Sequence, residues 1–218
     1  MKNQLSLFVA TFATLFVAPF GEAIKQTRKK IGFTQMKKIR TLCAMLFVLA
    51  TITGCTSQQY MSTIEGGEYD VNKDATDYFV LPLGQISLPG KWEKCGYNKE
   101  AHQQFFKNQD SVIVSASFSP TSRYEFNKNG TLKGLDFLLA FYEWESEYFK
   151  SKGFECQMIE TNDDSQYILY RIYGDTADTY FLVGIKGDGN VTNLSVNITD
   201  KWTKEEKILF LKNLFLAK

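Results

Sequence analysis

The segment 36–55 determines which part of this chain is available to fold into a domain. It opens with three basic side chains, continues through an apolar run from Leu42 to Thr53, and ends in Gly54 and Cys55. The run is too short for a transmembrane helix, which needs about 20 apolar residues. A basic start, a short apolar core and a small residue at the end are typical of a removable export signal. We therefore predict that residues 36–54 are cut off and that the folded part follows them.

The end of this signal, Ile52-Thr53-Gly54-Cys55, resembles the lipobox of bacterial lipoproteins. The resemblance implies cleavage between Gly54 and Cys55, a diacylglyceryl group on the Cys55 thiol, and acylation of the new amino terminus. Each buried CH₂ contributes about 0.8 kcal/mol, so two or more acyl chains make a lasting membrane anchor. The expected location is therefore the bacterial cell envelope. Thr56 stands where some bacteria place an aspartate that retains lipoproteins in the inner membrane, which favours the outer membrane, facing the periplasm.

Residues 1–35 precede this signal and contain a second apolar run, Leu5 to Phe20, followed by a basic cluster. The favoured interpretation is that translation begins at Met36 and that 1–35 is an over-called extension. The alternative is a membrane hairpin in which both apolar runs enter the bilayer. The basic loop between them would then remain in the cytoplasm.

Removal of the signal changes the charge of the protein. The whole chain has 25 Lys and Arg against 24 Asp and Glu, but residues 55–218 carry 17 basic and 23 acidic side chains, a net charge of −6. Nucleic acids and anionic lipid headgroups demand a basic face. An acidic domain therefore argues against both as partners.

The same cut leaves Cys95 and Cys156 as the only thiols of the mature domain. Outside the cytoplasm such a pair can form a disulfide, and closure of the 61-residue loop would stabilise the fold by about 4 kcal/mol. Two free thiols are an equally open alternative, because the sequence does not show whether the two Cα atoms come within bonding reach.

Residues 55–76 are polar and without apolar periodicity, which predicts a lipidated flexible tether. Residues 77–218 are long enough to form one globular domain. Their patterns predict an α+β fold with an antiparallel sheet of six or seven strands. The expected elements are extended segments at 78–83 and 85–88, a hairpin of 101–107 with 111–118, a helix over 132–150, a meander of 154–160, 167–173, 179–186 and 191–199, and a C-terminal helix opened by a capping box of Thr203 and Glu206.

Two of these strands carry apolar residues on one face and mainly polar residues on the other, which predicts one core face and one face toward water or a covering layer. The apolar sets are Val112, Val114, Ala116 and Phe118, and Leu194, Val196 and Ile198; the polar sets are Ser111, Ser115 and Ser117, and Asn193, Ser195 and Asn197.

The approach Ile86-Ser87-Leu88-Pro89-Gly90-Lys91-Trp92, followed by hairpin, helix, meander and closing helix, resembles the PsbP-like fold. That family is an α-β-α sandwich that includes photosystem-associated subunits, a Ran-binding nuclear transport factor and many uncharacterised bacterial lipoproteins. The resemblance covers 77–218. It implies a binding or accessory role and supplies no active-site residues, because such a fold hosts unrelated functions.

Few residues of this chain form a pattern typical of catalysis. His102 is the only histidine and is predicted to be an ordinary strand residue, so a histidine-based metal site would lack companions. There is no Gly-x-Ser-x-Gly elbow, phosphate-binding glycine loop or Cys-x-x-Cys pair. Asp163 and Asp164 are adjacent acids of the kind that form a hairpin turn. We therefore expect no enzyme, no metal and no cofactor.

Aromatic residues give the remaining functional signal. Most of those in the helix and central strands are expected to pack in the core; they include Tyr142, Trp144, Tyr148, Tyr167, Tyr170, Tyr173, Tyr180 and Phe181.

The favoured hypothesis is a non-catalytic envelope module that binds a protein partner through an exposed apolar or aromatic patch. The alternative is a small-ligand binder or hydrolase with a pocket between helix and sheet. The residues considered for a ligand or partner surface are Tyr170, Tyr180, Arg171 and His102.

Overall fold

The computed structural model of the chain describes residues 62–187 and 189–217, and those from Thr63 onward belong to one compact unit. The predicted extension, the signal, Gly54 and Cys55 lie outside the described residues. No helix within the described part is both long and apolar enough to cross a bilayer.

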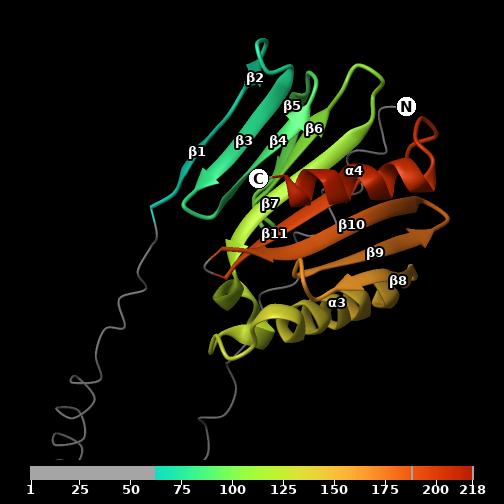
Figure 1. Cartoon of the computed structure of the whole chain (residues 1–218). Coiled ribbons are helices and arrows are strands. Elements are labelled where there is room, and N and C mark those ends of the chain that lie inside the picture. The colour runs from blue at the N-terminus through green and yellow to red at the C-terminus, as the bar shows by residue number, and fades with distance from the viewer. Residues whose placement is uncertain (1–61, 188, 218) are drawn as a thin grey trace, which may run out of the picture. The chain divides into compact units, whose positions relative to one another are not determined.

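Seven strands form the main sheet, and every neighbouring pair in it is antiparallel. The hairpin and the four-stranded meander that the sequence predicts are therefore confirmed (Figure 1). In sheet order, the strands are β5 (Glu93–Asn98), β6 (Gln103–Lys107), β7 (Ile113–Pro120), β11 (Asn190–Val196), β10 (Ala177–Lys186), β9 (Tyr167–Gly174) and β8 (Glu155–Asn162).

A smaller four-stranded sheet precedes the main one, formed by β1 (Ile64–Gly66), β2 (Tyr69–Asp70), β3 (Ala75–Leu81) and β4 (Gly84–Pro89). The prediction that the tether extends to residue 76 was wrong for its second half. β1 pairs with β3 from Ile64 opposite Leu81 to Gly66 opposite Phe79, so this stretch belongs to the folded part. Segments of two and three residues are too short to show periodicity, and their pairing depends on β3.

Two α-helices are described, α3 (Gly134–Ser151) and α4 (Lys204–Leu216). The capping box predicted for α4 is confirmed. The Glu206 N–H donates to Thr203 Oγ1 at 3.2 Å, and the Thr203 N–H donates to Glu206 Oε2 at 2.7 Å. These bonds satisfy backbone donors that the first turn of a helix leaves unpaired.

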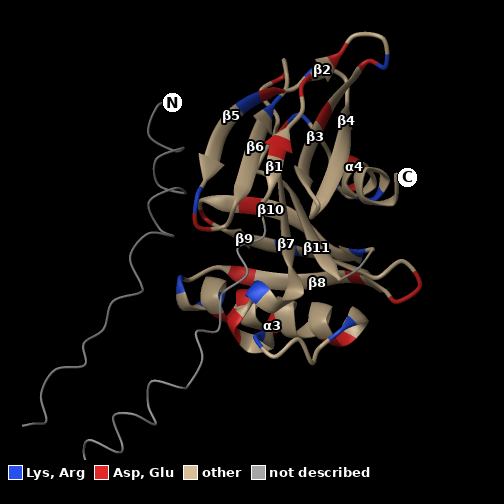
Figure 2. Ribbon diagram, turned by 90° about the vertical axis from the view of Figure 1, so that its left-hand side faces the viewer, with Lys and Arg blue, Asp and Glu red and all other residues tan. Residues whose placement is uncertain are grey.

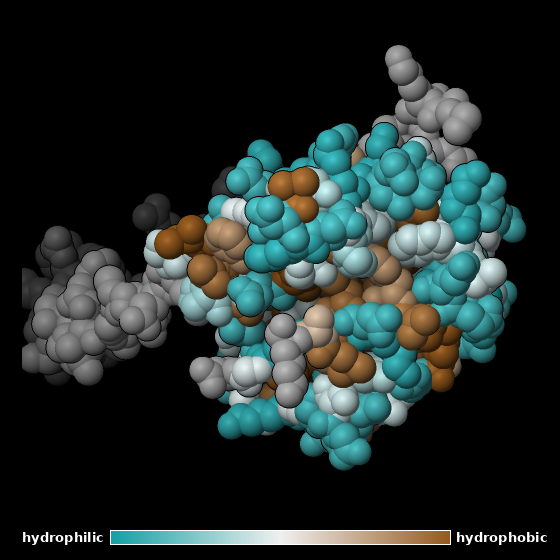
Figure 3. Space-filling view, turned by 45° about the horizontal axis from the view of Figure 1, so that its top comes forward, coloured by the Kyte–Doolittle hydropathy of each residue, from teal (hydrophilic) through white to brown (hydrophobic). Residues whose placement is uncertain are grey.

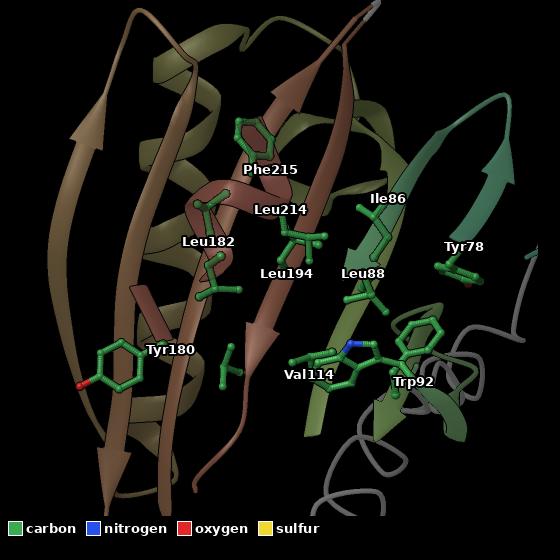
Figure 4. Close-up of a cluster of buried hydrophobic side chains, with 14 of the residues drawn as sticks. Tyr78, Ile86, Leu88, Trp92, Val114, Tyr180, Leu182, Leu194, Leu214 and Phe215 are labelled. Carbon is green, nitrogen blue, oxygen red and sulfur yellow. The ribbon is translucent and has the colours of Figure 1, made fainter. Parts of the chain in front are cut away.

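The described elements form three layers (Figure 2). α3 contacts β8, β9 and β10 on one face of the main sheet, while α4 and the small sheet cover the other face. The core beneath α4 and the small sheet includes Leu88, Trp92, Val114, Leu194 and Leu214 (Figure 4). The fold is α+β, as predicted from two helices and an antiparallel sheet of six or seven strands.

The two cysteines of the described part are free. Cys95 lies in β5 and Cys156 in β8, which are the two edges of the main sheet. Strands are spaced about 4.8 Å apart, so six spacings place these edges roughly 30 Å from each other. A disulfide between Cys95 and Cys156 is therefore ruled out in this fold, and the alternative of two free thiols holds.

The structure also corrects the position of His102. It lies in the turn that precedes β6, with a φ of 48°, and not in a strand. The strand before it, β5, has no counterpart among the predicted elements, because Glu93–Asn98 does not alternate and its pairing with β6 is interrupted by a bulge at Cys95.

Candidate binding surface

The structure separates the four residues considered from the sequence. Tyr170 faces α3, whereas Tyr180 and Arg171 lie on the opposite face of the sheet, directly across from each other on β10 and β9. His102 lies in the β5–β6 turn, at the far side of the strand order. Only Tyr180 and Arg171 are brought together, so the four residues do not line one pocket.

Arg171 belongs to an ion-pair cluster that joins α4 to the sheet. Its Nε donates to Asp178 Oδ1 at 2.6 Å, and the buried Lys207 of α4 places its Nζ 3.8 Å from Asp178 Oδ2. The Arg171 guanidinium lies 4.5 Å from the Tyr173 ring centroid, and Lys207 Nζ lies 5.3 Å from that of Tyr180. Each charge is thus paired within the protein, as in ion-pair clusters that stabilise a fold and do not bind a ligand.

On the face of the main sheet that points toward α3, the side chains change from apolar to polar from one part of the sheet to the other. Beneath α3 it is apolar, with Ile168, Phe181 and Val183 in the core. Beyond β10 it carries hydroxyl and amide side chains that are mostly buried, and we call these residues the polar face: Gln103, Ser115, Ser117, Asn193 and Ser195.

Hydrogen bonds connect three strands within this polar face. The Ser115 and Ser195 Oγ atoms lie 2.5 Å apart, and Gln103 Nε2 donates to Ser115 Oγ at 2.7 Å. The predicted alternation of β7 and β11 is therefore correct, but its polar side is an ordered network and not a water-exposed surface.

One atom of the polar face has no hydrogen-bond partner. Asn193 is only 9% exposed, and its Oδ1 is buried without a donor among the described residues. An unsatisfied buried amide oxygen costs about 1–3 kcal/mol, so such groups are uncommon in folded proteins and call for a physical explanation.

An aromatic ridge formed by Tyr124, Phe126 and Trp144 adjoins the polar face. Trp144 projects from α3 and is 43% exposed, with its ring centroid 6.0 Å from that of Tyr124 and 5.9 Å from that of Phe126. The Tyr124 hydroxyl lies 3.0 Å from Ser119 Oγ on β7. The ridge is therefore fixed by packing and by a hydrogen bond at the sheet.

A carboxyl group lies between α3 and the sheet. Glu145 accepts a hydrogen bond from the Tyr170 hydroxyl. Burial of the carboxyl raises the pKa of Glu145 to about 7, although the hydrogen bond from Tyr170 acts in the opposite direction. The same burial, together with the neighbouring carboxyl, raises the pKa of Tyr170 well above its usual value.

A small hollow lies at the C-terminal end of α3. Its volume of about 10 Å³ is at the lower limit for a single water molecule. Its lining is mostly apolar: Phe149, Phe154, Ile172, Ala177, Thr179 and Phe181. It therefore has neither the space nor the converging polar groups of a substrate pocket.

Burial also shifts the pKa values of titratable groups elsewhere in the fold. Burial raises the pKa of the Cys95 and Cys156 thiols, and burial together with Arg123 lowers the pKa of His102. Within residues 62–187 and 189–217, no group of three or more His, Cys, Asp or Glu side chains is placed to hold a metal ion.

No protein-family model matches this chain, and no curated protein gives a significant match. The surface is therefore interpreted from its own chemistry. The alternation of β7 and β11 indicates the polar face, whereas the ridge depends on how the loop after β7 packs on α3, for which the sequence holds no local signal.

Proposed function

We propose that this protein is a lipid-anchored, non-catalytic module of the bacterial cell envelope that binds a protein partner. The observation that carries the proposal is the aromatic ridge beside the polar face. Tryptophan and tyrosine are the residues most enriched among those that dominate binding energy at protein interfaces. Trp144 is half-exposed yet held by neighbouring rings, so little side-chain entropy is lost when a partner covers it.

The loop that carries Tyr124 and Phe126 supplies the polar part of such an interface. Glu125 lies between these two residues, and its exposed carboxylate pairs with Lys128 Nζ at 2.6 Å, whereas the polar face itself is mostly buried. Interfaces combine aromatic anchors with about one hydrogen bond per 100–200 Å². We infer that the partner contacts the ridge and forms its hydrogen bonds with the exposed groups around it.

The anchor and the fold family belong to the same proposal. The lipobox at Cys55 supports attachment to the envelope, with the outer membrane and the periplasmic side favoured by Thr56. Helices on both faces of an antiparallel sheet support membership of the PsbP-like sandwiches, on the bacterial lipoprotein branch. This fold assigns no chemistry by itself.

The ridge is tested by Trp144→Ala in the full-length protein, captured from detergent-solubilised envelopes after crosslinking. The matched control is Leu139→Ala, which truncates another partly exposed apolar side chain of α3. We expect the Trp144 variant to recover its partner at about one tenth of the wild-type yield or less, and the control to retain it. Equal recovery by both variants would show that the ridge is not the interface.

The anchor is tested separately by mass spectrometry of the native amino terminus, with Cys55→Ala as control. We expect an acylated chain that begins at Cys55 and an unprocessed chain in the variant. An unmodified Cys55 in the wild-type protein would contradict the envelope location.

A further inference from the structure

Four segments meet at one end of the compact unit: the start of β1, the β3–β4 turn, the β10–β11 turn and the C-terminus of α4. Asn190 Nδ2 donates to the Pro82 carbonyl oxygen at 3.4 Å, and Lys186 Nζ donates to the Ala217 carbonyl oxygen at 3.2 Å. These two bonds join the turns to each other and to α4, and Figure 1 shows the start of β1 and both turns at its left-hand side, with the C-terminal end of α4 pointing toward them.

This end of the unit exposes large apolar side chains, and we call Ile64, Leu81 and Leu216 the apolar end. Their exposed fractions are 66%, 44% and 48%. Ile64 and Leu81 are directly opposite each other on neighbouring strands, so their side chains share one face of the small sheet. In Figure 3, hydrophobic side chains reach the surface at the left, where Figure 1 places the start of β1.

Among the residues that the structure describes, the charged side chains next to the apolar end include Lys186 and Glu65, and both have partners within the protein. Lys186 lies 5.0 Å from the Phe215 ring centroid and bonds the end of α4. Glu65, next to Ile64, accepts a hydrogen bond from Tyr78 at 3.2 Å. Asp163 and Asp164 lie in the β8–β9 turn, further across the main sheet. A partner at this end is therefore selected by apolar contact more than by charge.

The chain length between Cys55 and the apolar end limits what that partner can be. β1 begins at Ile64, only nine residues after Cys55. A polypeptide spans at most 3.3–3.6 Å per residue, so the first strand is held within about 30 Å of the lipidated sulfur, whatever conformation the linker adopts. With a tether that lasted to residue 76, this limit would be more than twice as long.

We propose that the apolar end rests in the headgroup and acyl-chain boundary of the bilayer that carries the anchor. The inference depends on the lipid at Cys55 and adds a second contact, made by the folded domain itself. Apolar side chains favour this boundary in proportion to the area they remove from water. Because the contact is apolar, a zwitterionic bilayer is sufficient, which is compatible with the net acidic domain.

The test uses full-length lipidated protein in phosphatidylcholine vesicles and compares Leu81→Trp with Val71→Trp. Val71 is a matched control, since it is 74% exposed and lies beyond the other end of β3, about 20 Å along the strand direction. Fluorescence is measured with brominated lipids, which quench tryptophan in the membrane, and with acrylamide, which quenches it in water. Wild-type protein provides the contribution of the three native tryptophans.

We expect bromolipid quenching of the added fluorescence to be at least about threefold greater for Leu81→Trp than for Val71→Trp. Quenching of the Leu81→Trp fluorescence by acrylamide alone would place this end in water and overturn the inference. Quenching by neither agent would assign the surface to a protein contact, such as a second copy of the chain, and would overturn it equally.

Both variants replace exposed side chains, and unfolding in urea verifies that they remain folded. In a second test, we expect the tryptophan of Ile64→Trp to be quenched by bromolipids as strongly as that of Leu81→Trp, because the two positions are paired. Mass spectrometry of the same sample separates this inference from the anchor. A lipidated protein with a water-exposed apolar end overturns only the inference, whereas an unlipidated Cys55 overturns both.

Discussion

At the residue scale, Glu145 is a carboxyl group placed between α3 and the main sheet. Its carboxyl accepts one hydrogen bond from Tyr170 of β9, and the other titratable groups near it are Cys156 of β8 and Tyr124. None of these carries a positive charge. The protonated carboxyl is therefore favoured in the folded state, because burial penalises only the ionised form.

This placement predicts that the protein is more stable in mild acid than in mild base. The pKa of Glu145 rises from an ordinary value of 4.5 to about 7 on folding, so its contribution is fully present below pH 4.5 and is lost as the pH rises through about 7. We expect the free energy of unfolding in urea to be about 2 kcal/mol higher at pH 5 than at pH 8, allowing for solvent that reaches the partly exposed side chain.

The variant Glu145→Gln tests the origin of this dependence. It keeps an acceptor for Tyr170 but cannot ionise, so we expect it to flatten the difference between pH 5 and pH 8. Glu147→Gln, an exposed substitution two residues further along α3, is the control and should leave the difference unchanged. A flat profile in the wild-type protein would contradict the burial of the carboxyl.

The sequence predicts the type of residue on the polar face but not its surroundings. The alternation of Asn193 and Ser195 with apolar residues places them on one side of β11. Their burial and the unpaired Oδ1 of Asn193 depend on neighbours from strands distant in sequence. Local patterns carry no information on such neighbours.

At the element scale, α4 is held to the sheet by its apolar stripe and by the pairing of Lys207 with Asp178. Asp178 forms ion pairs with both Lys207 and Arg171, so removing the Asp178 carboxylate and removing the Lys207 ammonium have different consequences. Removal of the carboxylate leaves a buried ammonium without a counter-charge. Removal of Lys207 leaves Asp178 still bonded to Arg171.

We therefore expect Asp178→Asn to lower the free energy of unfolding by about 2–3 kcal/mol, and Lys207→Met to change it by no more than about 1 kcal/mol. Methionine preserves the buried stem of the lysine side chain. Urea unfolding of both variants measures this asymmetry. Equal losses would show that the ammonium itself contributes net stability.

Elements with a local signal were predicted well, and those without one were missed. α4 begins at its capping box, and most positions of β7 and β11 alternate between apolar and polar residues. β5 contains Gly96 next to the bulge at Cys95, and β1 and β2 are two or three residues long. β1 and β2 form because the longer β3 offers them an edge, and β5 forms on the edge of β6, so all three depend on tertiary contacts.

At the scale of the whole molecule, strand order determines the state of the thiols. Cys95 and Cys156 lie on opposite edges of the main sheet, although the hairpin and meander that contain them were predicted correctly. The sequence identifies neighbours within a hairpin or meander. It does not show that β7 and β11, which are separated along the chain by α3 and three strands, meet at the centre.

If the chain is cleaved and acylated at Cys55 as proposed, we expect it to expose two reactive thiols on unfolding in urea, with or without prior reduction. Both are partly buried in the native state, where burial raises their pKa values and slows the reaction. The measurement is a colorimetric thiol count. A count that rises only after reduction would indicate a disulfide and would contradict the strand order.

If the chain is anchored at Cys55 as proposed, the short pairing of β1 with β3 has a mechanical consequence. Tension on the amino-terminal end reaches the three residues of β1 first, and then the two of β2, before it loads the long strand β3. Peeling both strands frees the eleven residues from Ile64 to Asp74, and these extend by up to about 35–40 Å while the main sheet stays intact. Force can therefore lengthen the segment before β3 by this amount while the rest of the fold remains intact.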